Sequence, residues 1–274
     1  MIGRLGVCSW SLQADSPSEL VERVSACGLD AVQLALRPIR TDAWDLAETS
    51  KRLADAGIAI LSGMMEPIGE DYTTLESIKR TGGLRPSEHW QVNLELAQRD
   101  AVIAESLGLS LVTYHAGFLP HEPSDPERET MLDRIRQVAD VFARHGVRTA
   151  LETGQEDADT LITVLRAIDH PGVGVNFDPA NMVLYGMGDP IEALRALSPW
   201  VVQAHLKDAD PTTETGTWGV ERPAGVGSVP MDRYFELLGA MEVRVDVLIE
   251  RESGSQRVAD VAAARSIFDG LGAA

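Results

Sequence analysis

RTALETGQEDADTLITVLRAIDHPGVGVNFDPAN, residues 148–181, decides the fold, because an apolar run, a helical segment and a second apolar run follow one another within it. The two runs, 148–152 and 173–178, are mostly apolar rather than alternating, which is typical of strands that are covered on both faces. The segment 157–169 between them has the period of a helix. The stretch therefore predicts one strand–helix–strand unit of a parallel sheet.

The same unit repeats outward to both ends of the chain. We expect strands at Leu5–Trp10, Ala31–Leu36, Ile58–Met64, Leu111–His115, Arg148–Glu152, Val173–Asp178, Val201–Leu206 and Asp246–Glu250. We expect helices near residues 18–27, 42–56, 91–107, 129–145, 157–169, 190–197, 231–240 and 256–270. Eight strands, each followed by a helix, predict an α/β fold in which residues 1–274 form a single (β/α)8 TIM barrel. An open, doubly wound sheet is the alternative.

Glycines support the repeat, because one follows a predicted helix and precedes a predicted strand at Gly28, Gly57, Gly108 and Gly146. A glycine at this position predicts a left-handed residue that ends the helix. Two connections are much longer than the others, residues 65–90 and 209–230. Both follow strands, so we expect them at the C-terminal end of the barrel, where long loops usually cover a site.

Composition excludes several classes of protein. The 274 residues carry 24 Lys and Arg against 42 Asp and Glu, a formal net charge of −18, which argues against nucleic-acid partners and anionic membrane surfaces. No apolar run approaches the roughly 18 residues that a membrane span needs. Two cysteines make no disulfide framework, and the first residues do not resemble a signal peptide, so the expected location is cytoplasmic.

Polar side chains end the last four predicted strands: Glu152, Asp178, His205 and Glu250. Strand ends of this kind meet at the mouth of a barrel, where active sites lie. Three carboxylates and an imidazole would repel one another there without a cation, so the pattern predicts a site for Mn²⁺, Mg²⁺, Co²⁺ or Zn²⁺. Taken singly, each residue has a structural alternative: an acid at a strand end often caps the next helix, and a histidine can belong to the core.

Five segments carry a family resemblance: LETG (151–154), NFDPAN (176–181), HLKD (205–208), GVGSVPMDRYFELL (225–238) and LIERE (248–252). With them the whole chain resembles the sugar phosphate isomerase/epimerase family, the xylose isomerase-like barrels that include ketose 3-epimerases, inosose dehydratase and the endonuclease IV group. The resemblance implies that the four strand-end residues bind one divalent metal, with Mn²⁺ as the first choice. It also implies that Glu152 and Glu250 act as acid and base on opposite faces of a sugar, and that His115 matches a histidine of the family.

The chain departs from the ketose 3-epimerase pattern at three positions. Asn181, Ala158 and Pro211 stand where those enzymes carry a histidine, a glutamate and an arginine that grip the substrate's first hydroxyl groups. The departures put a free-ketose 3-epimerase in doubt and leave dehydratases and lyases open. Six histidines and the acidic charge do not resemble the endonuclease group, which uses a three-zinc cluster.

Further side chains are candidates for binding the substrate. Trp10, Trp218 and His89 could form a wall on which a sugar stacks, with ordinary loop packing as the alternative. Glu221 lies in a loop that could close over the substrate, and Lys207 could donate to a substrate oxygen or form a surface ion pair. Asn181 and His115 complete the set of expected substrate-binding residues. No glycine-rich loop with a lysine is present, which favours a carbohydrate without phosphate.

The expected reaction starts when a glutamate removes a proton from the carbon next to a carbonyl group and forms an enediolate. Return of the proton makes the protein an isomerase or epimerase, and departure of a neighbouring group makes it a lyase such as a dehydratase. A hypothesis from another class is a barrel that only binds carbohydrate. The resemblance also implies a possible homo-oligomer, a dimer or a tetramer.

Overall fold

The computed structural model describes residues 2–214 and 216–271. Its centre is a closed barrel of parallel strands in the order β1-β10-β7-β6-β5-β4-β3-β2. The strands are β1 (Ile2–Cys8), β2 (Ala31–Ala35), β3 (Ala59–Met64), β4 (Leu111–Tyr114), β5 (Arg148–Glu152), β6 (Val173–Phe177), β7 (Val201–Leu206) and β10 (Val245–Ile249). Closure confirms the TIM barrel and excludes the open sheet.

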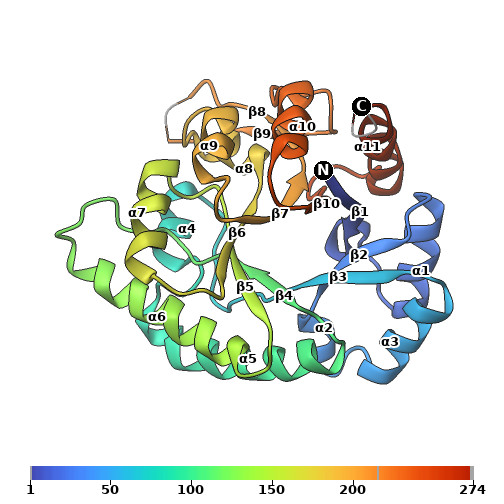
Figure 1. Cartoon of the computed structure of the whole chain (residues 1–274), viewed down its shortest axis with the longest axis horizontal. Coiled ribbons are helices and arrows are strands. Elements are labelled where there is room, and N and C mark those ends of the chain that lie inside the picture. Colours follow the sequence, from blue (N-terminus) through green and yellow to red (C-terminus); the bar gives the residue numbers. More distant parts are fainter. Residues whose placement is uncertain (1, 215, 272–274) are drawn as a thin grey trace.

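Helices surround the strands, and the chain runs once around the ring from blue to red (Figure 1). Those that follow successive strands are α1 (Pro17–Ala26), α3 (Leu46–Asp55), α5 (Ser87–Ser106), α6 (Pro126–Ala143), α7 (Ala158–Ile168), α9 (Pro190–Leu197), α10 (Met231–Ala240) and α11 (Arg257–Leu271). Every residue of β2 and of β6 is buried, as expected for strands between helices and barrel interior. No helix within residues 2–214 and 216–271 is long and apolar enough to cross a membrane.

The predicted helix ends have their expected conformations. The φ angles of Gly28, Gly57, Gly108 and Gly146 are +68°, +71°, +68° and +70°, so each occupies the left-handed region that favours glycine. The helix predicted from residue 42 starts only at Leu46, because Asp45 caps it by accepting a hydrogen bond from the backbone N–H of Glu48; a separate short helix, α2 (Arg37–Arg40), precedes it. The first strand ends at Cys8 because the chain turns into a 3₁₀ helix, η1 (Ser9–Leu12).

Four predicted strands were one residue too long at their C-terminal ends. Leu36, His115, Asp178 and Glu250 each lie directly after a strand rather than within it. For Asp178 the reason is local: its Oδ1 accepts hydrogen bonds from the backbone N–H groups of Ala180 and Asn181 and starts α8 (Pro179–Tyr185). The functional side chains therefore stand on the rim of the barrel, immediately above its strands.

The two long connections contain structure that the sequence did not reveal. Residues 65–90 include α4 (Leu75–Thr81) and the first turn of α5. The other connection contributes β9 (Val220–Arg222), which pairs antiparallel with β8 (Asp208–Asp210) directly after the seventh barrel strand. Both connections leave the C-terminal end of the barrel.

Candidate metal centre and active site

Four strand ends bring Glu152, Asp178, His205 and Glu250 to one point at the mouth of the barrel. Each offers a ligand atom within 4.8 Å of the others, and all four residues are buried. The Nδ1 atom of His205 lies 3.7 Å from Glu152 Oε1, 3.6 Å from Asp178 Oδ2 and 3.5 Å from Glu250 Oε2. One imidazole nitrogen and three carboxylate oxygens form a donor set suited to a divalent ion.

Two atoms of this group test whether a metal fits. His205 Nδ1 and Asp178 Oδ2 are buried and have no hydrogen-bond partner. Unpaired buried polar atoms are costly unless something binds them, and these two face the same space. Oδ1 of Asp178 caps α8, while Oδ2 accepts no hydrogen bond, lies 3.5 Å from Lys207 Nζ and faces the other three residues. The residues fit a bound divalent metal.

The orientation of His205 is set from behind the site. Its Nε2 atom lies 2.9 Å from Gln33 Oε1, and Gln33 is held in turn by a hydrogen bond of 2.7 Å from its Nε2 to Thr113 Oγ1. With its proton on Nε2, the histidine would donate to this amide oxygen and keep the lone pair of Nδ1 facing the carboxylates; Asn176 Nδ2 also lies 3.0 Å from Nε2. Gln33 is completely buried in β2, within the barrel interior.

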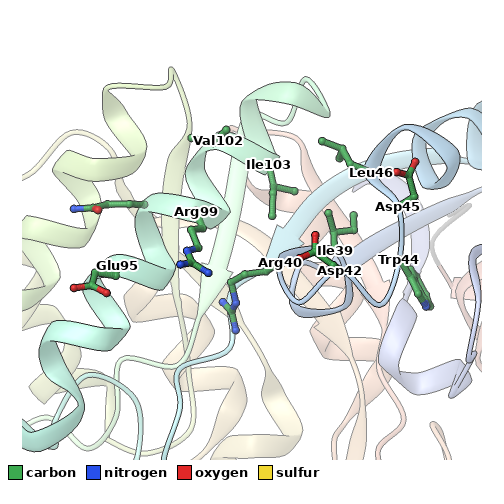
Figure 2. A pocket seen from close by; sticks show the side chains of 11 residues that line it. Ile39, Arg40, Asp42, Trp44, Asp45, Leu46, Glu95, Arg99, Val102 and Ile103 are labelled. Carbon is green, nitrogen blue, oxygen red and sulfur yellow. The ribbon is translucent and has the colours of Figure 1, made fainter.

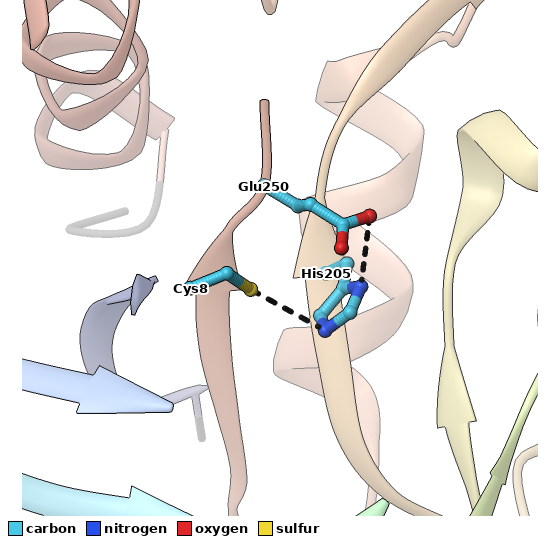
Figure 3. A group of neighbouring side chains, drawn as sticks. All are labelled: Cys8, His205 and Glu250. Atoms are coloured by element: carbon cyan, nitrogen blue, oxygen red, sulfur yellow. Dashed lines mark hydrogen bonds and ion pairs between the residues drawn. The ribbon is translucent and has the colours of Figure 1, made fainter. Parts of the chain in front are cut away.

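Cys8 contacts the ring of His205 at Nε2, the nitrogen that faces away from the carboxylates. Figure 3 shows its sulfur directed at Nε2, 3.7 Å away, while Glu250 lies beside Nδ1. Burial raises the pKa of Cys8 to about 12. Its sulfur lies at Nε2, whereas three carboxylates of the strand-end group lie at Nδ1, so the strand-end group offers more ligands to one ion.

The two glutamates of the group are held differently. Glu152 accepts hydrogen bonds from two neutral amides, Asn181 Nδ2 at 3.0 Å and Asn176 Nδ2 at 3.2 Å. Glu250 accepts from Trp10 Nε1 at 2.8 Å and from the charged Lys207 Nζ at 2.7 Å. Burial raises the pKa of Glu152 to about 7, with His115 partly offsetting the effect. Burial opposes ionisation of Glu250 too, but Lys207 and His205 outweigh it and hold its pKa well below the ordinary value.

Lys207 lies inside the site, with 1% of its side chain exposed. Its Nζ donates to Glu252 Oε2 at 2.6 Å and to Asn181 Oδ1 at 3.1 Å, besides its bond to Glu250. Burial disfavours the ammonium charge, but the surrounding carboxylates raise the pKa of Lys207 well above its ordinary value. The surface ion pair considered from the sequence is thus wrong, because this lysine is a buried cation.

A cavity of about 570 Å³ opens beside the four residues. Trp10, His115, Glu250 and Glu252 line it on the barrel side, and residues from the 65–90 connection, among them Glu66, Glu70 and Tyr72, form the opposite wall. The Nε2 atom of His115 lies 3.7 Å from Glu152 Oε1. The size and polar lining of this cavity suit a small hydrophilic molecule.

Three expected substrate-binding residues lie elsewhere. Trp218 packs edge-on against Tyr185, with ring centroids 4.8 Å apart, and Glu221 forms an ion pair with the buried Arg251 and accepts from the backbone N–H of Glu252. His89 packs next to Gly69. None of the three lines the 570 Å³ cavity. Their contacts are with other side chains and with the backbone of loops.

The sequence did not single out Gln33, Asn176 or Glu252, although each contacts a residue of the site. The sequence nevertheless contains a pattern that could have identified each of the three. Gln33 and Asn176 are lone amides in otherwise apolar strands, AVQLA and VGVNF. Glu252 follows Glu250 by two residues and completes the charged end LIERE.

A larger cavity, of about 760 Å³, lies on the flank of the barrel between the α2–α3 segment and α5 (Figure 2). Its walls mix apolar residues such as Ile39 and Ile103 with scattered charges such as Asp42 and Arg99. Within residues 2–214 and 216–271, groups of three or more metal-ligating side chains occur only around His205. Converging ligands, rather than volume, therefore mark the candidate active site.

Comparisons with known proteins agree with the fold. The family model described as "Xylose isomerase-like TIM barrel" matches residues 21–269. The solved structure of a xylose isomerase domain protein from Planctomyces limnophilus is 32% identical, covers 92% of this chain and 91% of that chain, and has a TM-score of 0.86.

Two curated relatives match over shorter stretches. A 3-dehydroshikimate dehydratase from Bacillus anthracis is 33% identical over 89 residues, 31% of each chain. A 3-oxo-isoapionate decarboxylase from Pectobacterium atrosepticum is 24% identical over 156 residues, 56% of this chain and 55% of the relative. The matches thus span about a third and about half of the curated relatives' lengths. The match of the family model over most of the chain shows that the protein belongs to the xylose isomerase-like TIM barrel family.

Proposed function

We propose that this protein is a divalent-metal-dependent enzyme that removes a proton next to the ketone of a polyhydroxylated substrate and forms an enediolate. The observation that carries the proposal is the convergence of Glu152, Asp178, His205 and Glu250 beside a polar cavity of about 570 Å³. When bound there, a divalent ion would act as a Lewis acid on the carbonyl and neighbouring hydroxyl oxygens of the substrate.

Glu152 is the proposed base. Neutral amides hold its two oxygens, and no ammonium group contacts it, so it keeps its affinity for a proton. Glu250 is held by Trp10 and by the cation of Lys207, which favour its ionised form and fix its position. His115, next to Glu152 on the cavity wall, is the proposed partner of a substrate oxygen.

The first candidate activity is isomerisation or epimerisation of a keto-sugar. Return of the proton by Glu152 to the neighbouring carbon gives isomerisation. Delivery of a proton to the opposite face gives epimerisation, which would require Glu250 to take up a proton against the charge of Lys207. The lining of the cavity favours a substrate without phosphate, because Glu66, Glu70 and Glu252 join Glu250 there, and one of its two arginines, Arg40, is already paired with Asp100.

A lyase is the second candidate, and a specific observation favours it. Both curated relatives carry names of lyases that act beside a ketone: one eliminates water from a 3-dehydro acid and the other removes the carboxyl group of a 3-oxo acid. Elimination needs one base, which agrees with the unequal contacts of the two glutamates.

Proton NMR in D₂O tests the proposal. The Mn²⁺-loaded protein is incubated with a panel of keto-sugars and keto-polyols, and the metal is removed before spectra are recorded. We expect loss of the signal of the proton next to the ketone, dependent on both the metal and Glu152. The product then separates isomerase, epimerase and lyase. A protein that holds metal tightly yet exchanges no proton in any hydroxyketone would contradict the proposed chemistry, and one that binds no metal would favour a barrel that only binds carbohydrate.

A further inference from the structure

Lys207 has the surroundings of a metal ion. Its Nζ atom is enclosed by four oxygens: Glu252 Oε2 at 2.6 Å, Glu250 Oε2 at 2.7 Å, Asn181 Oδ1 at 3.1 Å and Asp178 Oδ2 at 3.5 Å. Three of the four belong to carboxylates. Such a shell of oxygen atoms is the kind that hard divalent cations take in proteins.

Two of these oxygens also face the proposed metal position. Glu250 Oε2 lies 3.5 Å from His205 Nδ1, and Asp178 Oδ2 lies 3.6 Å from the same nitrogen. A single oxygen of each carboxylate is thus directed both at the ammonium of Lys207 and at the space in front of His205. This sharing is the arrangement of bridging carboxylates in a centre with two cations.

The charges lead to the same conclusion. Glu152, Asp178, Glu250 and Glu252 bring four negative charges into contact with this group. One divalent ion and one ammonium leave a single excess negative charge, whereas one divalent ion alone would leave two. Glu152, Asp178 and Glu250 are buried and Glu252 is half exposed, so an ammonium beside Glu250 and Glu252 offsets negative charge that one divalent ion leaves uncompensated.

We propose that Lys207 occupies the position of a second divalent cation and restricts the site to one metal ion. This inference rests on the proposed metal site of the preceding section. Its consequence is chemical: two ions about 3.5–4 Å apart are the arrangement that hydrolyses phosphate esters, and a lysine in the second position cannot bind and activate a water molecule as a metal does. Lys207 therefore determines the metal stoichiometry and, with it, the class of reaction.

The test measures how many Mn²⁺ ions bind to the full chain, by calorimetry and metal analysis, together with the electron paramagnetic resonance spectrum. We expect one ion in the wild type, with the signal of an isolated Mn²⁺. Lys207→Ala is expected to bind two, with the altered spectrum of two coupled ions. Adding Glu252→Ala to that variant removes an oxygen ligand of the second position and is expected to return the count to one. Lys51→Ala removes an exposed lysine far from the site and serves as the matched control.

Each outcome is decisive. A single uncoupled ion in folded Lys207→Ala would overturn the inference and leave the proposed function standing, and so would two ions in the wild type. A wild type that binds no Mn²⁺ would overturn the metal site itself, and the proposed function with it. If Lys207→Ala does not fold, Lys207→Ser, which adds a hydroxyl group able to bind a metal, is measured in the same way.

Discussion

The two sides of the candidate site use the same residue type in opposite surroundings. On one side Glu152, at the end of β5, is held by the neutral amides of Asn176 and Asn181. On the other side Glu250, after β10, is held by Trp10 and the ammonium of Lys207. Both carboxylates are buried, so burial alone does not distinguish them.

The difference shows how a barrel assigns unlike roles to like residues. A carboxylate surrounded by neutral donors keeps a high affinity for a proton, and one beside a fixed cation loses it. We therefore propose proton transfer on the side of Glu152 and charge compensation on the side of Glu250. Substitutions on the two sides test whether Glu152 and Glu250 differ in this way.

The largest expected effect separates the two glutamates directly. Glu152→Gln should lower proton exchange in D₂O by about 10²–10⁴-fold or more, because the base is lost, and saturating Mn²⁺ should not restore it. Glu250→Gln should also lose net turnover, but through the metal, so that part of the exchange returns when Mn²⁺ is raised. The measurement is exchange of the substrate proton against Mn²⁺ concentration. Equal loss of exchange in both variants at saturating Mn²⁺ would remove the distinction.

Glu156 is a second buried carboxyl group on the side of Glu152, and the groups that lower its pKa include no lysine or arginine. Burial raises the pKa of Glu156 to about 8, with His115 only partly offsetting the effect. The folded protein therefore keeps a proton that the unfolded chain releases above its ordinary pKa of 4.5, so stability falls as the pH rises from about 4.5 to 8.

Glu156→Gln removes this cost. We expect the variant to be as stable as the wild type at pH 4.5 and more stable by about 3 kcal/mol at pH 7, from about 1.4 kcal/mol for each pH unit. Urea unfolding at pH 5, 6, 7 and 8 measures the difference. Glu236→Gln on the exposed face of α10 is the control and should change stability by less than about 0.5 kcal/mol. A constant difference at every pH would show that Glu156 does not titrate in this range.

The sequence predicted the barrel and the convergence of Glu152, Asp178, His205 and Glu250 for the same reason. Parallel strands share a direction, so a polar residue that ends an apolar run is placed at the mouth whichever strand carries it. Exact strand ends were not needed for this: four predicted strands ran one residue too far, among them those predicted to end at Asp178 and Glu250.

What the sequence could not predict depends on contacts between strands and loops. The amide of Gln33 reaches His205, 172 residues away, and no local pattern indicates that pairing. The indole of Trp10 lies against Glu250, whereas that of Trp218 packs on Tyr185. An aromatic residue in a loop has no periodicity, so its direction follows only from tertiary packing.

His205 lies between the two glutamates, and Gln33 contacts it from the barrel interior. A substitution of Gln33 therefore tests the role of the histidine orientation without removing a hydrogen bond to Glu152 or Glu250. Gln33→Leu removes the oxygen that accepts from Nε2, so the ring loses its fixed orientation toward the carboxylates. We expect the dissociation constant for Mn²⁺ to rise about 10–100-fold. Asn93→Leu, the same kind of change at another buried amide, which accepts from the backbone N–H of Ile68 and donates to the carbonyl of Gly83 instead, is the matched control. Calorimetric titration compares the two variants, and equal weakening in both would assign the effect to packing.

The smallest expected effect concerns the hydrogen bond from Trp10 to Glu250. Trp10→Phe keeps an aromatic ring beside His205 but removes the Nε1 donor, whereas Lys207 still holds the other carboxylate oxygen. We therefore expect the affinity for Mn²⁺ to fall only about fivefold, near the 1 kcal/mol typical of one hydrogen bond. Trp218→Phe should leave it unchanged, because that ring contacts Tyr185 outside the cavity. A loss in Trp10→Phe as large as that in Gln33→Leu would mean that Trp10, and not Lys207, holds Glu250 in place.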